Sequence, residues 1–117
     1  MPICWQNNTS VEHLMSSKKM QSCEIGLTVG QIDLIELHEA FAAQTLANMR
    51  ELGITEKDYD RVNVNGSCVS IGHPLGATGL RILITLLNEM KRRRSRYGMI
   101  TICGGGGMGV SGILEWV

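Results

Sequence analysis

The sequence predicts an α/β domain in which a mixed β-sheet is covered by helices on both faces. The first observation behind this prediction is a short apolar run at residues 32–37, typical of a buried strand. The second is a pair of segments that carry apolar side chains at helical spacings of three and four. The third is a final pair of strands, at 97–103 and 109–116, which a run of glycines separates and which we expect to be antiparallel.

The two predicted helices differ in the strength of their patterns. The first begins at Ala40, stops at Gly53, and has an apolar stripe formed by Phe41, Thr45, Leu46, Met49 and Leu52. The second opens from a turn at 72–79, with Thr78 as a candidate cap, and its stripe is formed by Leu80, Leu83, Ile84, Leu87 and Met90. It ends in residues 91–94, all Lys or Arg, which complement the negative end of the helix dipole.

Two segments have no clear pattern. Residues 1–22 are polar, with one possible helical turn at Val11, Leu14 and Met15, so a frayed helix and a disordered arm both remain open. The state of residues 68–71 is also open. We therefore expect an N-terminal arm at 1–25 and one domain at 26–117.

Composition excludes several classes of function. Eleven basic and eleven acidic residues balance, and aromatic residues make up 4%, so neither a nucleic acid nor an anionic membrane is expected as the main partner. The apolar runs are too short to cross a bilayer, and residues 1–10 do not resemble a secretory signal. We expect a soluble intracellular protein. Mitochondrial, peroxisomal and cytoplasmic locations are not distinguished.

The chain has four cysteines, Cys4, Cys23, Cys68 and Cys103, without any Cys-x-x-Cys spacing. Four cysteines could form two disulfides in a secreted protein, but no secretion signal supports that alternative. We interpret them as reduced thiols.

Three segments carry candidate chemistry, and each follows a strand or opens a helix, where ligands bind in α/β sheets. They are His38-Glu39-Ala40-Phe41, the turn from Gly72-His73 to Gly79, and Cys103-Gly104-Gly105-Gly106-Gly107-Met108-Gly109. A histidine is often structural, a buried cysteine is usually inert, and a glycine run can mean only a tight bend. The combination and order of the three segments are more specific than any one of them.

In these segments the chain resembles the thiolase family. Thiolases carry Asn-Glu-Ala-Phe or His-Glu-Ala-Phe, then Gly-His-Pro-x-Gly-x-Thr-Gly, then Cys-x-Gly-Gly-Gly-x-Gly. The resemblance covers residues 33–117, and we expect it to extend back to about Gly26. It implies the C-terminal half of a thiolase fold.

The resemblance also implies roles for individual residues in an acyltransferase that cleaves or forms 3-oxoacyl-CoA. His73 matches the base that activates a nucleophilic cysteine, and Cys103 matches the thiol that acts as general acid and base. Gly105 matches a backbone oxyanion donor, and His38 matches a residue that stabilises the enolate. The expected contacts to substrate and CoA are Gly72, Gly76, Glu39, Phe41 and Gly104. CoA or acyl-CoA is then a substrate, and no tightly bound cofactor is expected.

The resemblance fails at the nucleophile, which thiolases carry in their N-terminal half. Cys23-Glu24-Ile25-Gly26-Leu27 only faintly matches that motif, because the residues after it are poor helix formers. We therefore expect the chain to be inactive alone and to need a complementary N-terminal half or a homo-oligomer. Ser67 and Cys68 replace a glycine and a small residue, and His38 replaces the more usual Asn, as in members that act on longer chains.

Three alternatives stay open. The chain could be a non-catalytic fragment that serves as an interaction or structural module through its exposed apolar face. A metal site built from His38, Cys68, His73 and Cys103 would lack the short ligand spacing of structural zinc sites, so no metal is expected. The basic stretch at 91–96 could contact a CoA phosphate, although a solvated helix end is the simpler interpretation.

Overall fold

The computed structural model describes residues 3–8, 26–106 and 108–117. In chain order the elements are β1 (Ile3–Asn8), η1 (Val29–Gln31), β2 (Leu34–Leu37), α3 (Ala42–Glu51), η2 (Glu56–Asp58), α4 (Cys68–Ile71), α5 (Thr78–Arg93), β3 (Tyr97–Gly105) and β4 (Met108–Glu115). The undecided segment at 68–71 is thus a single helical turn. No helix in these described ranges is long and apolar enough to cross a membrane.

The strands form one mixed sheet in the order β1-β4-β3-β2. The central pair β3 and β4 is antiparallel, as expected, and β2 lies parallel to β3. Strand β1 pairs antiparallel with β4. The expectation of a frayed helix or a disordered arm is therefore wrong for Ile3–Asn8, which completes a sheet edge. Val11, Leu14, Met15 and Cys23 lie outside the described residues.

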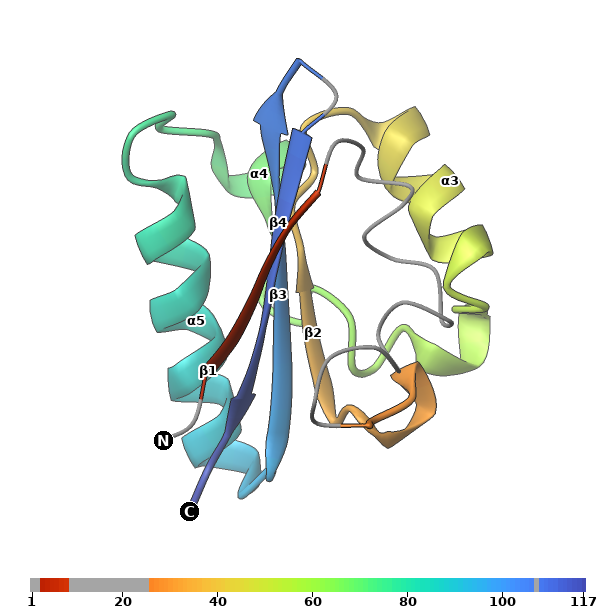
Figure 1. The fold of residues 1–117 in the computed structure, drawn as a ribbon, viewed down its shortest axis with the longest axis vertical. Coiled ribbons are helices and arrows are strands. Elements are labelled where there is room, and N and C mark those ends of the chain that lie inside the picture. The colour runs from red at the N-terminus through yellow and green to blue at the C-terminus, as the bar shows by residue number, and fades with distance from the viewer. Residues whose placement is uncertain (1–2, 9–25, 107) are drawn as a thin grey trace.

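Helices cover both faces of the sheet, α5 on one side and α3 on the other (Figure 1). Each face has its own apolar core. Below α5 the core consists of Leu34, Ile82, Leu86, Met90, Ile100 and Leu114. On the α3 side it consists of Leu27, Val29, Ile32, Ile35, Leu37, Leu52, Ile54, Val62, Met99 and Ile113. In β2, Leu34 packs into the core on the α5 side and Ile35 and Leu37 pack into the core on the α3 side, and all four residues of the strand are buried. The predicted α/β class is confirmed.

The predicted apolar stripes are only partly correct. In α5, the face that packs on the sheet contains Ile82, Leu86 and Met90, whereas Leu80 and Ile84 are exposed. The helix is apolar over more than one face, so spacing alone could not select the buried one. Phe41 and Leu46 are exposed, because α3 reaches the core mainly through Met49 and through Leu52, the first residue after the helix.

The basic end of α5 is largely committed to contacts within the chain. Glu89 accepts hydrogen bonds from both Arg92 and Arg93, and Arg93 also donates to the backbone oxygen of Asp60. Arg96 pairs with Glu115 of β4. These contacts favour the structural interpretation of the basic stretch over a phosphate contact.

Candidate active site

His38 lies directly after β2 and is held by two hydrogen bonds to the neighbouring strand. Its backbone N–H donates to the oxygen of Thr101, and its ring Nδ1 accepts the backbone N–H of Cys103 at 3.0 Å. Because Nδ1 is an acceptor, the proton of the neutral ring lies on Nε2. That Nε2 is buried and has no hydrogen-bond partner, in a residue only 4% exposed. Burial lowers the pKa of His38 below its ordinary value, and the positive charge that His73 carries when protonated and that of Arg81 act in the same direction, so the ring is neutral near pH 7.

His73 lies in the turn between α4 and α5, and its ring has the opposite tautomer. Gly72 permits the turn, because its φ of 106° is a conformation that residues with a side chain rarely adopt. The Nδ1 atom of His73 is 2.7 Å from the hydroxyl oxygen of Thr78, and that hydroxyl donates its own proton to the carbonyl oxygen of Pro74. Thr78 therefore accepts from an Nδ1–H, which leaves Nε2 of His73 with a free lone pair.

This contact corrects the expected role of Thr78. The residue that caps α5 is Ala77, without a side-chain hydrogen bond, and Thr78 is the first residue of the helix. The threonine is 1% exposed, so its hydroxyl is a fixed partner that orients the imidazole of the exposed His73.

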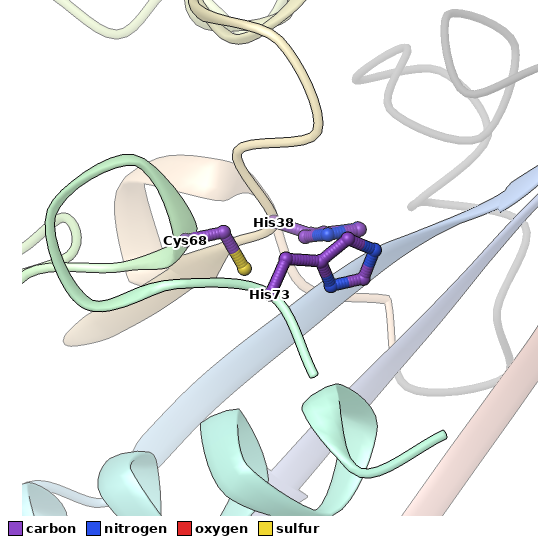
Figure 2. Close-up of side chains that lie close together, drawn as sticks. All are labelled: His38, Cys68 and His73. Carbon is purple, nitrogen blue, oxygen red and sulfur yellow. The ribbon is translucent and has the colours of Figure 1, made fainter. Parts of the chain in front are cut away.

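The two imidazole rings face each other, with centroids 4.5 Å apart and planes inclined by 54° (Figure 2). Their hydrogen bonds assign complementary tautomers: Nε2 of His38 is a donor, and Nε2 of His73 is an acceptor. A pair of this kind can take a proton from one reacting group while donating a hydrogen bond to another. The three motifs predict that both imidazoles and the thiol of Cys103 meet in one pocket. The two imidazoles do meet, although 35 positions separate them in the sequence, but among the described residues the thiol grouped with them is that of Cys68.

The thiol beside the two rings is that of Cys68. Its sulfur and one nitrogen of each ring lie within 4.8 Å of one another, and Figure 2 shows the sulfur directed toward His73. A side-chain N–H of Arg81 in α5 donates to the sulfur at 3.1 Å. In the sequence, Cys68 was noted as a departure from the thiolase pattern and as one of four candidate metal ligands, three of which, His38, Cys68 and His73, the structure brings together.

Cys103, the predicted acid–base thiol, is connected to the site through its backbone. Its N–H fixes His38, while its partly buried side chain packs against the core on the α3 side of the sheet. Gly104 and Gly105 continue β3 into the glycine turn, and the strand register shifts between Cys103 and Gly105. Gly105 has a φ of 80°, which favours glycine at this position.

Two polar side chains hold the strand, the α4 turn and the His38 segment together. Asn63 accepts the N–H of Leu37 at 2.7 Å and donates both to the oxygen of Leu37 and to Glu39. The other carboxylate oxygen of Glu39 accepts the backbone N–H of Val69 at 2.9 Å. Glu39, the residue after His38, is thus tied to Val69, the residue after Cys68.

A buried carboxyl and guanidinium lie beneath this layer. Glu36 of β2 is 2% exposed, and one of its oxygens has no hydrogen-bond partner. Burial raises its pKa to about 7; the positive charge of Arg81 opposes that shift, and Glu39 and Glu89 add to it. Sequence patterning missed this group because Glu36 lies within an otherwise apolar strand.

Two further predicted contact residues lie on the surface. Phe41 is 74% exposed at the start of α3, and Gly76 lies in the exposed turn before α5. A cavity of about 450 Å³ lies against α3, lined by Glu39, Ala42, Thr45, Leu46, Met49, Tyr59, Val62, Asn63 and Val69. Its lining includes the chain neighbours of both His38 and Cys68.

The hydrogen bond to His38 argues against a metal at this cluster. A histidine that binds a metal through one nitrogen normally donates the proton on the other nitrogen to an oxygen acceptor. Here Nδ1 of His38 accepts an N–H, so a metal on Nε2 would require a ring without any proton. The arrangement is better suited to proton transfer than to ligation.

The fold and the paired histidines define an α/β domain suited to acid–base chemistry, and comparisons with known proteins give its family. The family described as "Thiolase, C-terminal domain" matches residues 11–116. The chain is 56% identical over 90 residues to an acetyl-CoA acetyltransferase of Syntrophomonas wolfei, which covers 77% of this chain and 22% of that protein. It is 50% identical over 90 residues to a 3-ketoacyl-CoA thiolase of Bacillus subtilis, with the same two coverages. The chain belongs to the thiolase family, as a C-terminal domain.

The structural comparison agrees with this assignment. The crystal structure of the Bacillus anthracis acetyl-CoA acetyltransferase superposes with a TM-score of 0.82 and 36% identity, covering 97% of this chain and 29% of that one. The chain thus spans less than a third of the length of each of these three relatives.

Proposed function

We propose that the chain is the C-terminal part of an acyltransferase that cleaves or forms 3-oxoacyl-CoA with CoA and acetyl-CoA. The observation that carries this proposal is the facing pair of imidazoles, one with a free lone pair and one with a free N–H. Thioester exchange needs both functions at once, a base for a thiol and a donor for the oxygen on which negative charge develops.

Each residue then has a defined task. The free Nε2 of His73 takes the proton of a nucleophilic cysteine on a complementary thiolase N-terminal half. The Nε2–H of His38 donates to the enolate oxygen of the acetyl group. Cys103 acts as the general acid and base, and the N–H of Gly105 stabilises a thioester oxyanion. Removal of one such oxyanion donor typically lowers turnover by about a hundredfold or more.

The substrate side of the proposal follows from the exposed turns. The backbone at Gly72, Gly76 and Gly104 is exposed, and so is the ring of Phe41; we propose that these residues contact the pantetheine arm of CoA. Glu39 acts indirectly, through the backbone that it holds. CoA binds as a substrate, and no tightly bound cofactor is needed.

The partner side follows from apolar surface next to the site. Five large apolar residues near the paired histidines are exposed, namely Phe41, Leu46, Val69, Ile71 and Leu75. A concentration of this kind is typical of a surface that another protein covers. We propose that a complementary N-terminal half covers it, with a homo-oligomer as the alternative. If nothing covers it, the non-catalytic fragment remains the second candidate.

The test is thiolysis of acetoacetyl-CoA by the purified chain, with and without a supplied N-terminal half of a thiolase. We expect activity only in the mixture, and we expect His73→Asn and Cys103→Ala to lower it at least about a hundredfold. The third histidine of the chain provides the matched control, His13→Asn, which should retain activity. Full activity of the mixture containing the His73 variant would contradict the proposed roles.

A further inference from the structure

Cys68 places a thiol beside both imidazoles within this chain. The sulfur and one nitrogen of each ring lie within 4.8 Å of one another, and the sulfur points toward His73 (Figure 2). The proposed function leaves this thiol without a task, because the nucleophile of that reaction belongs to the N-terminal half of the thiolase fold. The buried Nε2 of His38, which has no partner, is a second and independent sign that a polar ligand belongs here.

We propose that Cys68 is an acyl acceptor, a nucleophile by which this chain alone takes an acyl group from a small acyl thioester. His73 is the base, and the N–H of His38 is the donor for the carbonyl oxygen. The inference shares both histidines with the proposed function but requires neither Cys103 nor an N-terminal half.

The chemistry balances without a further reagent. Nε2 of His73 takes the proton of the Cys68 thiol, and the sulfur attacks the carbonyl carbon of the thioester. The bond between that carbon and the leaving sulfur breaks, and the leaving thiolate takes the proton back from the His73 imidazolium. The products are a thioester on Cys68 and one free thiol, for example CoA when acetyl-CoA is the donor.

The surrounding contacts suit this reaction. The N–H of Arg81 holds the sulfur, which keeps the thiol on the side of the rings. Cys68 is 7% exposed, whereas His73 is exposed, so the thioester approaches past the His73 ring. The sulfur and one nitrogen of each ring lie within 4.8 Å of one another, and catalytic contacts of this kind often tighten only when a substrate is bound.

The experiment uses the full chain with acetyl-CoA, followed by proteolysis and mass spectrometry that locates acetyl groups on each of the four cysteines. We expect Cys68 to be acetylated first, and hydroxylamine to release the label, as it does for a thioester. His73→Asn should slow the labelling of Cys68 at least about tenfold, while His13→Asn should not. The same chain unfolded in urea should lose the preference for Cys68.

Three outcomes would overturn the inference: equal labelling of Cys68 and Cys103 in the folded chain, a preference that survives unfolding, or an unchanged rate in the folded His73→Asn variant. The thiolysis assay with an N-terminal half is a separate measurement. A failure of that assay would contradict the proposed function but not the acylation of Cys68. A failure to acylate Cys68 would contradict this inference but not the proposed function.

Discussion

The buried carboxyl of Glu36 gives the fold a pH dependence that one substitution should remove. Burial raises its pKa from 4.5 to about 7 in the folded chain. An acid with a raised folded pKa stabilises the fold fully below its unfolded pKa, and this contribution is lost as the pH rises through the folded pKa. The window is therefore pH 4.5 to about 7.

The perturbation is Glu36→Gln, which keeps the shape of the protonated carboxyl and cannot ionise. The pKa difference lowers the unfolding free energy of the parent chain by about 3 kcal/mol at pH 8 and by less than about 1 kcal/mol at pH 5, relative to low pH. The variant should exceed the parent chain in stability by these amounts. The buried His38 has the opposite pH trend, but it is common to both chains and cancels in the difference.

The assay is urea unfolding of both chains at pH 5 and pH 8, with the midpoint and slope compared at each pH. Glu56→Gln, at an exposed glutamate of η2, is the matched control and should change stability little at either pH. If Glu36→Gln and the parent chain differ by the same amount at both pH values, Glu36 is not a carboxyl that loses its hydration on folding.

Three further changes test other parts of the structure. Asn63→Ala removes three side-chain hydrogen bonds at a residue with a φ of 47°. Urea unfolding should therefore show that the free energy of unfolding falls by about 3 kcal/mol, and a fall of less than about 1 kcal/mol would refute this. Gly98→Ala would place a Cβ 2.5 Å from the sulfur of Met90, so thermal unfolding should show about 1–3 kcal/mol of destabilisation, and an unchanged melting temperature would contradict that packing. Thr78→Val leaves the Nδ1–H of His73 without its acceptor. The rate of acetoacetyl-CoA thiolysis in the presence of an N-terminal half should then fall about tenfold, while circular dichroism should show an unchanged fold. Undiminished activity would show that this contact does not orient the ring.

The predictable parts of the fold are those in which the sequence pattern is compatible with only one type of secondary structure. The apolar run before His38 and the strands around the glycine turn were identified because buried strands need such runs. Strand β1 was missed because an edge strand depends on its partner β4 rather than on its own weak pattern. The buried face of α5 was assigned only in part, because Leu80 and Ile84 are as apolar as the residues that do pack on the sheet.

The site was predictable where the chemistry lies in a motif. His38 and His73 were identified as candidates because one follows a strand and the other lies in a turn that opens a helix, where ligands bind in α/β sheets. The hydroxyl of Thr78 and the thiol of Cys68 acquire their roles only through geometry. A threonine in a helix opening is ordinarily interpreted as a cap, and no spacing rule signals that its oxygen will instead fix an imidazole.

The complementary tautomers of the two histidines are the foundation of both proposals. Long-range proton–nitrogen correlation spectra of the ¹⁵N-labelled chain at neutral pH identify which ring nitrogen carries the proton in each imidazole. The structure predicts a proton on Nε2 of His38 and on Nδ1 of His73. A proton on Nε2 in both rings, or a doubly protonated His38, would contradict the acid–base pair described above.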